Sequence, residues 1–215
     1  MILTPIPSER LPETLRQFRD SLADPFAREM LDRIAATSPD RAAAEVAETH
    51  RQQALALARE FGMGIAGELC GASLSWDGER LHADTEGFVL VHEIAHFQLA
   101  APERRRIIDF GLGAGPDTVD RAAAERVAML TEFAGDREEA MVSLLGILWE
   151  ARLGHPALAS FLDQNWLEGA GTERAAAHFV SVLRRLSEGG FVDRAGQPTR
   201  QLRQDPDEAA ELRAA

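Results

Sequence analysis

The chain has 215 residues, of which 45% are hydrophobic and 27% charged, a composition typical of a folded globular protein. Its formal net charge of −12 argues against nucleic acid and anionic membranes as partners, because both attract basic proteins. A single cysteine excludes an internal disulfide framework, and no apolar run is long enough to cross a membrane. Residues 1–13 lack the features of a secretory signal, so we expect a cytoplasmic protein.

The elements predicted in chain order are mostly helical. Asp24-Pro25 and Ser38-Pro39 are typical of helix starts, and one β-hairpin is expected about the tight turn at Asp77-Gly78. Further helices are expected over residues 87–100, 102–109, 118–134, 137–153, 156–166 and 173–187. The predicted fold is mainly α with one small β-hairpin, a single-domain helical bundle over residues 1–200 followed by a polar tail over 201–215.

The most informative motif lies in the helix predicted over residues 87–100, which Asp84 is expected to cap. His92-Glu93-Ile94-Ala95-His96 is an HExxH sequence, and histidines four residues apart lie one helical turn above each other. Both imidazoles can therefore bind one metal ion, with Glu93 placed to hydrogen-bond a metal-bound water. The flanking residues are apolar nearly all round, which predicts a buried helix whose polar groups need a partner such as a metal.

Two histidines do not complete a metal site, and the residues after His96 lack the third histidine of the metzincin motif. A downstream carboxylate is therefore the expected third ligand. Glu125 is preferred, because its predicted helix can fold back on the site and apolar residues flank it. Glu132, Glu138 and Glu139 are rivals, each more simply interpreted as part of a solvated helix face.

A charged run follows the metal helix and ends at Asp109. Its arginines, Arg105 among them, are expected to border the mouth of the site. For Asp109 two interpretations stay open: it accepts the free N–H of a ligating histidine, or it forms a surface ion pair with an arginine one turn earlier.

These motifs together resemble the bacterial elongation factor P hydroxylases. The resemblance spans Gly87–Asp117: the HEIAH motif, Arg104-Arg105 starting eight residues beyond its second histidine, the sequence IIDFG, and Pro116-Asp117. It implies a non-haem enzyme that uses Fe(II) and oxygen to hydroxylate a modified lysine side chain of a translation factor. It also implies that His92, Glu93 and His96 form the metal motif and that Glu125 is the carboxylate ligand.

Three functions follow from this reading. The first is a non-haem iron oxygenase acting on a protein side chain or a related substrate. The second is a zinc metallopeptidase in which Glu93 deprotonates the attacking water, although the chain has no tyrosine to stabilise an oxyanion. The third is a metal-stabilised regulatory protein without catalysis. We expect the oxygenase, with Fe(II) preferred and Zn(II) as the alternative.

Overall fold

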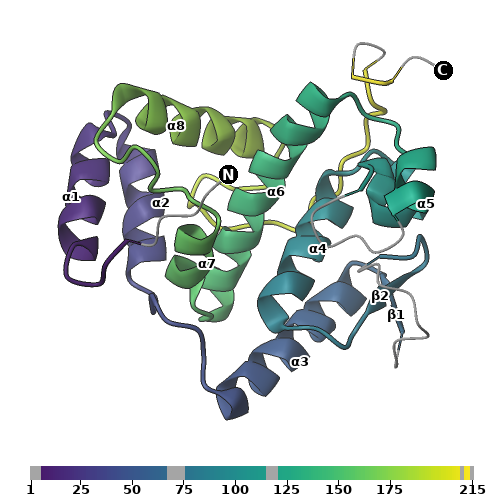
Figure 1. The fold of residues 1–215 in the computed structure, drawn as a ribbon, viewed down its shortest axis with the longest axis horizontal. Coiled ribbons are helices and arrows are strands. Elements are labelled where there is room, and N and C mark those ends of the chain that lie inside the picture. Colours follow the sequence, from purple (N-terminus) through teal and green to yellow (C-terminus); the bar gives the residue numbers. More distant parts are fainter. Residues whose placement is uncertain (1–5, 67–75, 115–120, 209–210, 214–215) are drawn as a thin grey trace. The chain divides into compact units, whose positions relative to one another are not determined.

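A computed structural model describes residues 6–66, 76–114, 121–208 and 211–213, and it is mainly helical with one small β element, as predicted (Figure 1). The elements are α1 (Leu11–Ser21), α2 (Pro25–Ala35), α3 (Ala44–Glu60), β1 (Gly64–Ala66), β2 (Arg80–His82), α4 (Gly87–Leu99), η1 (Arg104–Arg106), η2 (Ile108–Gly111), α5 (Arg121–Arg126), α6 (Glu132–Leu153), α7 (Ala157–Asp163) and α8 (Glu173–Glu188). None of the helices in these ranges combines the length and apolarity that crossing a membrane requires.

Two compact units make up the chain; whether they form the single domain expected over residues 1–200 stays a prediction. Unit 1 consists of residues 1–44 and 143–199, and unit 2 consists of residues 45–142 and 200–215. The division falls within α6, so the first part of this helix belongs to unit 2 and the remainder to unit 1.

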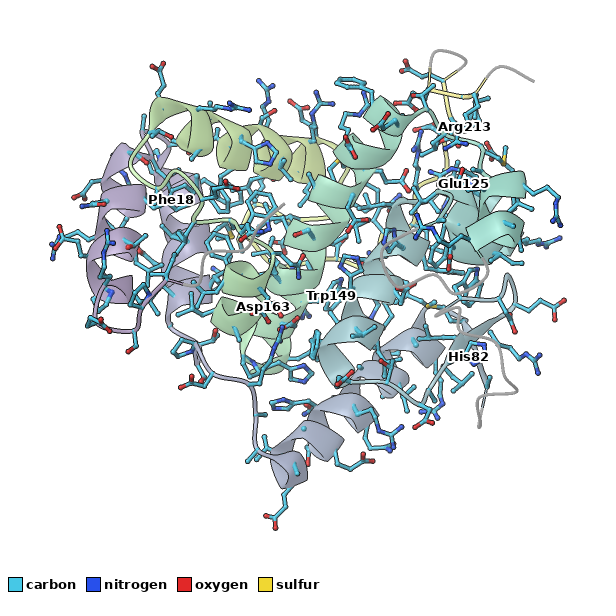
Figure 2. The ribbon with its side chains drawn as sticks, viewed as in Figure 1. Phe18, His82, Glu125, Trp149, Asp163 and Arg213 are labelled. Carbon is cyan, nitrogen blue, oxygen red and sulfur yellow. The ribbon has the colours of Figure 1, made fainter. Side chains whose placement is uncertain are left out.

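Unit 1 has an aromatic core to which α1, α7 and α8 contribute. The ring of Phe18 on α1 lies 5.6 Å from Phe179 on α8, and Phe161 on α7 stacks on Trp166 at 5.9 Å (Figure 2). The predicted start of α2 is confirmed, because the Asp24 side chain accepts a hydrogen bond from the backbone N–H of Phe26 at 2.9 Å.

A buried carboxyl group lies in the same unit. Glu150 on α6 has a side-chain exposure of 3%, and Ser160 Oγ lies 2.7 and 2.8 Å from its two oxygens. Burial raises the pKa of Glu150 to about 7, although the hydrogen bond from Ser160 and the charge of Arg41 act in the opposite direction.

This pKa predicts that Glu150 destabilises the fold at alkaline pH. A carboxyl group with a raised folded-state pKa keeps its proton in the folded chain, so its contribution to stability is lost as the pH rises through about 7. Glu150→Gln should therefore gain stability relative to the native chain between pH 5 and pH 8, by up to about 3 kcal/mol. Urea denaturation at both pH values measures this gain. The exposed Glu188→Gln should show none, and a gain for Glu150→Gln that is equal at both pH values would contradict the prediction.

The β element of unit 2 differs from the predicted hairpin. The turn is present, with Asp77 Oδ1 accepting the backbone N–H groups of Glu79 and Arg80 at 2.8 and 2.7 Å. However, β2 pairs in parallel with β1, Ile65 lying opposite Leu81. Among the described residues, the antiparallel pairing across the turn is one bridge between Trp76 and Leu81. Residues 72–75 of the predicted first strand lie outside the described residues.

Several helix ends also differ from their predicted positions. Glu86, not Asp84, is the N-cap residue of α4. The helix predicted over 118–134 is described only as the short α5, and the next helix begins at Glu132 instead of 137. The earlier start has a local cause, because Thr131 Oγ1 accepts the backbone N–H of Ala134 at 3.3 Å.

The segment expected to be a loose polar tail lies against unit 2. The backbone N–H of Arg203 donates to the carbonyl of Gln98 at 2.9 Å, and that of Arg213 donates to the carbonyl of Met129 at 2.7 Å. Asp207 in the same segment has a side-chain exposure of only 1%. The polar composition of this segment therefore did not mean that it is loose, because its polar groups bond to other residues of unit 2.

Candidate metal centre

Helix α4 places its two histidines one turn apart with their Nε2 atoms 3.2 Å from each other. Glu139 on α6 completes a group of three ligand-type side chains. Its Oε1 lies 3.2 Å from His92 Nε2, and its Oε2 lies 3.3 Å from His96 Nε2. Within the described ranges, His92, His96 and Glu139 are the side chains of metal-binding type whose ligand atoms lie close enough together to hold one ion.

The spacing of these donor atoms fits a divalent transition metal. Ligands about 2.1 Å from one ion lie about 3.0 Å apart at octahedral angles and about 3.4 Å apart at tetrahedral angles. The observed separations of 3.2 and 3.3 Å fall between these values. Two imidazoles and a carboxylate suit both iron and zinc, so the donor set is compatible with a metal but does not select one.

The three side chains of the group differ in burial, and Glu139 is the most exposed of them. His96 has a side-chain exposure of 7% and His92 of 24%, whereas Glu139 is half exposed. The group is therefore exposed to solvent on the side of Glu139.

The electrostatics of the group couple the histidines to the carboxylate. Burial opposes a charge on His96, but the charge and hydrogen bond of Glu139, aided by Glu93 and Glu138, outweigh it and raise the pKa of His96 to about 9. Burial likewise opposes ionisation of Glu139, yet His96 and the hydrogen bond from His92 hold its pKa well below its ordinary value. Without a metal, a proton on His96 therefore compensates the carboxylate.

An aromatic stack covers the other side of His96. The ring of Phe110 stacks on His96 at 5.4 Å, and Trp76 stacks on Phe110 at 5.5 Å. Phe110 reaches this position through left-handed backbone at Asp109 and Phe110, with φ of 46° and 54°. Such backbone costs about 1–3 kcal/mol per residue, so the surrounding contacts must stabilise it.

One of the two interpretations of Asp109 was that it accepts the free N–H of a ligating histidine, and this does not apply to His96. The Nδ1 atom of His96 is buried and has no hydrogen-bond partner among the described residues. The contact from this segment to His96 is made by Phe110 instead. Whether Asp109 orients His92 stays a prediction.

The buried Arg104 connects two segments that contribute to the surroundings of the metal group. Arg104 has no exposed side-chain surface, and its Nε donates to Asp207 at 2.6 Å. Its Nη1 donates to the carbonyl of Phe110 at 2.7 Å and to Glu138 at 3.1 Å. Arg104 therefore joins the turn that covers His96 to the stretch of α6 that carries Glu139. This connection was not predicted, because nothing in the sequence distinguishes Arg104 from the two arginines after it.

The preference for Glu125 as third ligand is not supported by its position. Its side chain is half exposed and pairs with Arg213 at 3.1 Å; both residues are labelled in Figure 2. The backbone N–H of Ala114 donates to its other oxygen at 3.2 Å. Of the rivals, Glu138 pairs with Arg104 and Glu132 lies in the first turn of α6, which leaves Glu139 beside the histidines.

Glu93 and Arg105 occupy different surroundings. Glu93 is half-buried on α4, and its charge helps to raise the pKa of His96, which places it close to the group. Arg105 donates through Nε to the carbonyl of Phe97 at 2.9 Å and through Nη2 to that of Arg203. It lines a pocket to which none of the three ligand-type residues contributes, so the described contacts do not place it at the mouth of the metal site.

No protein-family model, curated protein or solved structure matches this chain.

The pKa of His96 predicts how metal affinity depends on pH. Because a metal must displace the proton from His96, affinity should rise about tenfold per pH unit between about 6.5 and 9 and then level off. Competition for Zn(II) against a chelator of known proton affinity measures this slope. An affinity that is flat across the range would contradict a shared site for His96 and the metal.

Proposed function

We propose that this protein is a non-haem oxygenase that binds Fe(II) through His92, His96 and Glu139 and hydroxylates a protein side chain or a related substrate. The observation that carries the proposal is the convergence of two imidazole nitrogens and a carboxylate, 3.2–3.3 Å apart, with one side exposed to solvent. Two histidines and one carboxylate on one face of an iron leave positions for oxygen and substrate, the arrangement of many non-haem Fe(II) oxygenases.

When bound, Fe(II) supplies the activation of oxygen, and the chain's own side chains hold and shield the site. His92 and His96 hold the metal from one helix, and Glu139 holds it from another. The Phe110 ring excludes water from the buried side of His96, which limits loss of reactive species on that side. Glu93 is placed to hold a water or a polar group of the substrate near the metal.

A zinc hydrolase is the second candidate, and Glu93 favours it, because a half-buried carboxylate between two metal-binding histidines is the general base of HExxH peptidases. Two observations weigh against it. The chain has no tyrosine, and the strands described in unit 2 are three residues long, which gives little edge on which to lay an extended peptide.

The metal bound on purification distinguishes these functions without a known substrate, and nitric oxide tests whether a bound iron has an open position. Protein loaded anaerobically with Fe(II) should bind nitric oxide and give the half-integer-spin resonance of a non-haem iron nitrosyl, because open positions remain on the iron. Protein purified without added metal should contain iron in excess of zinc. Zinc at one equivalent, no nitrosyl signal after iron loading and cleavage of casein would favour the hydrolase and contradict the oxygenase.

Glu93→Gln separates the two roles of this residue. In an oxygenase Glu93 is not a ligand, so the variant should bind Fe(II) within about threefold of the native affinity and keep its nitrosyl signal. In a hydrolase the same variant should lose about 100- to 10,000-fold in turnover, because the water loses its base. Metal titration and the resonance signal are measured on both proteins. Loss of the nitrosyl signal together with the metal would show that Glu93 is itself needed to bind the ion.

A further inference from the structure

Unit 2 contains a second candidate binding site, a pocket of about 580 Å³ that is separate from the metal group. Its apolar lining comes from Trp76, Phe97 and Pro102, and its cationic lining comes from Arg105 and Arg106. The volume lies within the range of pockets that bind small organic molecules. The ring of Phe110 lies between Trp76 and His96, so a molecule in this pocket does not contact the histidines.

The two arginines give the pocket positive charge that is not engaged in an ion pair among the described residues. Arg105 is half-buried, and its hydrogen-bond acceptors are the backbone carbonyls of Phe97 and Arg203. Burial and the neighbouring charge of Arg203 lower its pKa, whereas Glu103 partly opposes them. Among the described residues, neither Arg105 nor Arg106 forms an ion pair with a carboxylate, and this includes Glu79, which also lines the pocket.

This arrangement is unusual in a chain of net charge −12, where carboxylates outnumber basic side chains by 35 to 23. A half-buried guanidinium that is held in place by carbonyls and forms no ion pair among the described residues is stabilised when an anion binds it. The Arg106 side chain is exposed, and a guanidinium can make a two-pronged contact with a carboxylate or a phosphate. The apolar surface beside it suits a hydrocarbon or aromatic body.

The geometry points to a ligand site for a small organic anion, with a carboxylate or phosphate head on Arg105 and Arg106 and an apolar body against Phe97 and Pro102. The site does not depend on the proposed function, because none of its residues belongs to the metal group. The turn at Gly78, which also lines the pocket, packs closely against the backbone of Arg106. A Cβ on Gly78 would lie only 2.8 Å from the Arg106 carbonyl oxygen, so a larger residue does not fit there.

The test uses the full chain and four probes: benzoate, phenyl phosphate, the neutral benzamide and inorganic phosphate. The chain has three tryptophans, so the indole N–H signal of Trp76 can be assigned with Trp76→Phe and followed by NMR. Benzoate or phenyl phosphate should shift this signal with a dissociation constant of about 1 mM or tighter, and benzamide should bind at least tenfold more weakly. Whichever of the two anions binds more tightly identifies the head group.

Matched variants locate the binding. Arg106→Gln should weaken the better anion about tenfold or more without changing the fold, because its side chain is exposed. Arg59→Gln, an exposed arginine on α3 in the same unit, should have no effect. No saturable binding, equal binding of benzamide, or an affinity unchanged in both Arg106→Gln and Arg105→Gln would overturn the proposal. Inorganic phosphate binding as tightly as phenyl phosphate would overturn the apolar part of the site. Because all measurements are made without metal, each result is independent of the iron proposal.

Discussion

Glu139→Ala is expected to weaken metal binding at least 100-fold. Replacing groups that merely hydrogen-bond a ligand already costs about 10- to 100-fold in metal affinity, and in the proposed site Glu139 is itself a ligand. Its removal also takes away the largest attraction that raises the pKa of His96. The metal-free variant should therefore titrate His96 at a lower pH than the native chain, which NMR of the imidazole measures.

Glu125→Ala is the matched control, because it removes a carboxylate that pairs with Arg213 and does not face the histidines. Its affinity for Zn(II), measured by chelator competition, should stay within about twofold of the native value. The opposite ranking, with Glu125→Ala losing the metal and Glu139→Ala keeping it, would restore the ligand preferred from the sequence and contradict the site described for Glu139.

Arg104→Met is expected to destabilise unit 2 by about 3–5 kcal/mol. Arg104 is fully buried, and removing it takes away the buried positive partner of Glu138 and Asp207. The partly exposed Arg203 then remains as their positive partner, at 3.9 and 3.1 Å. The backbone carbonyl of Phe110 also loses its hydrogen bond, which removes one contact that stabilises the left-handed turn. Urea denaturation measures the loss of stability, and amide hydrogen exchange should place it in residues 45–142 and 200–215.

A compensated variant tests whether charge is the cause. When Arg104→Met is combined with Glu138→Leu and Asp207→Leu, both buried carboxylates are removed, and most of the lost stability should return. Arg203, which pairs with both of them, keeps Glu211 as a partner at 3.7 Å. Arg59→Met, at an exposed position, should cost less than about 0.5 kcal/mol. A triple variant as unstable as Arg104→Met alone would show that packing, and not the buried carboxylates, determines the stability of this region.

The metal helix was the most predictable part of the molecule. Its apolar surroundings and the four-residue spacing of His92 and His96 are local properties, and the structure places α4 within one residue of the predicted range. The mainly helical fold was predictable for the same reason. In contrast, the third ligand depends on where two helices meet. Because α6 was expected to begin at 137, Glu139 was expected near a helix end; the cap at Thr131 places it two turns inside.

Other differences come from interactions between distant residues. The parallel pairing joins the second strand of the predicted hairpin, β2, to β1, which lies before the hairpin in the sequence. Local sequence around the turn at Asp77-Gly78 does not reveal such a partner. The polar segment after residue 200 was expected to be loose, but the buried Arg104 requires a second carboxylate, and Asp207 supplies it. Likewise, Glu125 has apolar neighbours in sequence, yet its partner Arg213 lies 88 residues away.

X-ray absorption spectroscopy of the protein loaded with one equivalent of Fe(II) under anaerobic conditions tests the metal centre most directly. We predict nitrogen and oxygen ligands at about 2.0–2.2 Å with the outer-shell scattering of two imidazoles, and loss of that scattering in the variant His92→Ala/His96→Ala. A spectrum without imidazole scattering, or one that is unchanged in the double variant, would show that the metal is bound elsewhere and would contradict the site formed by His92, His96 and Glu139.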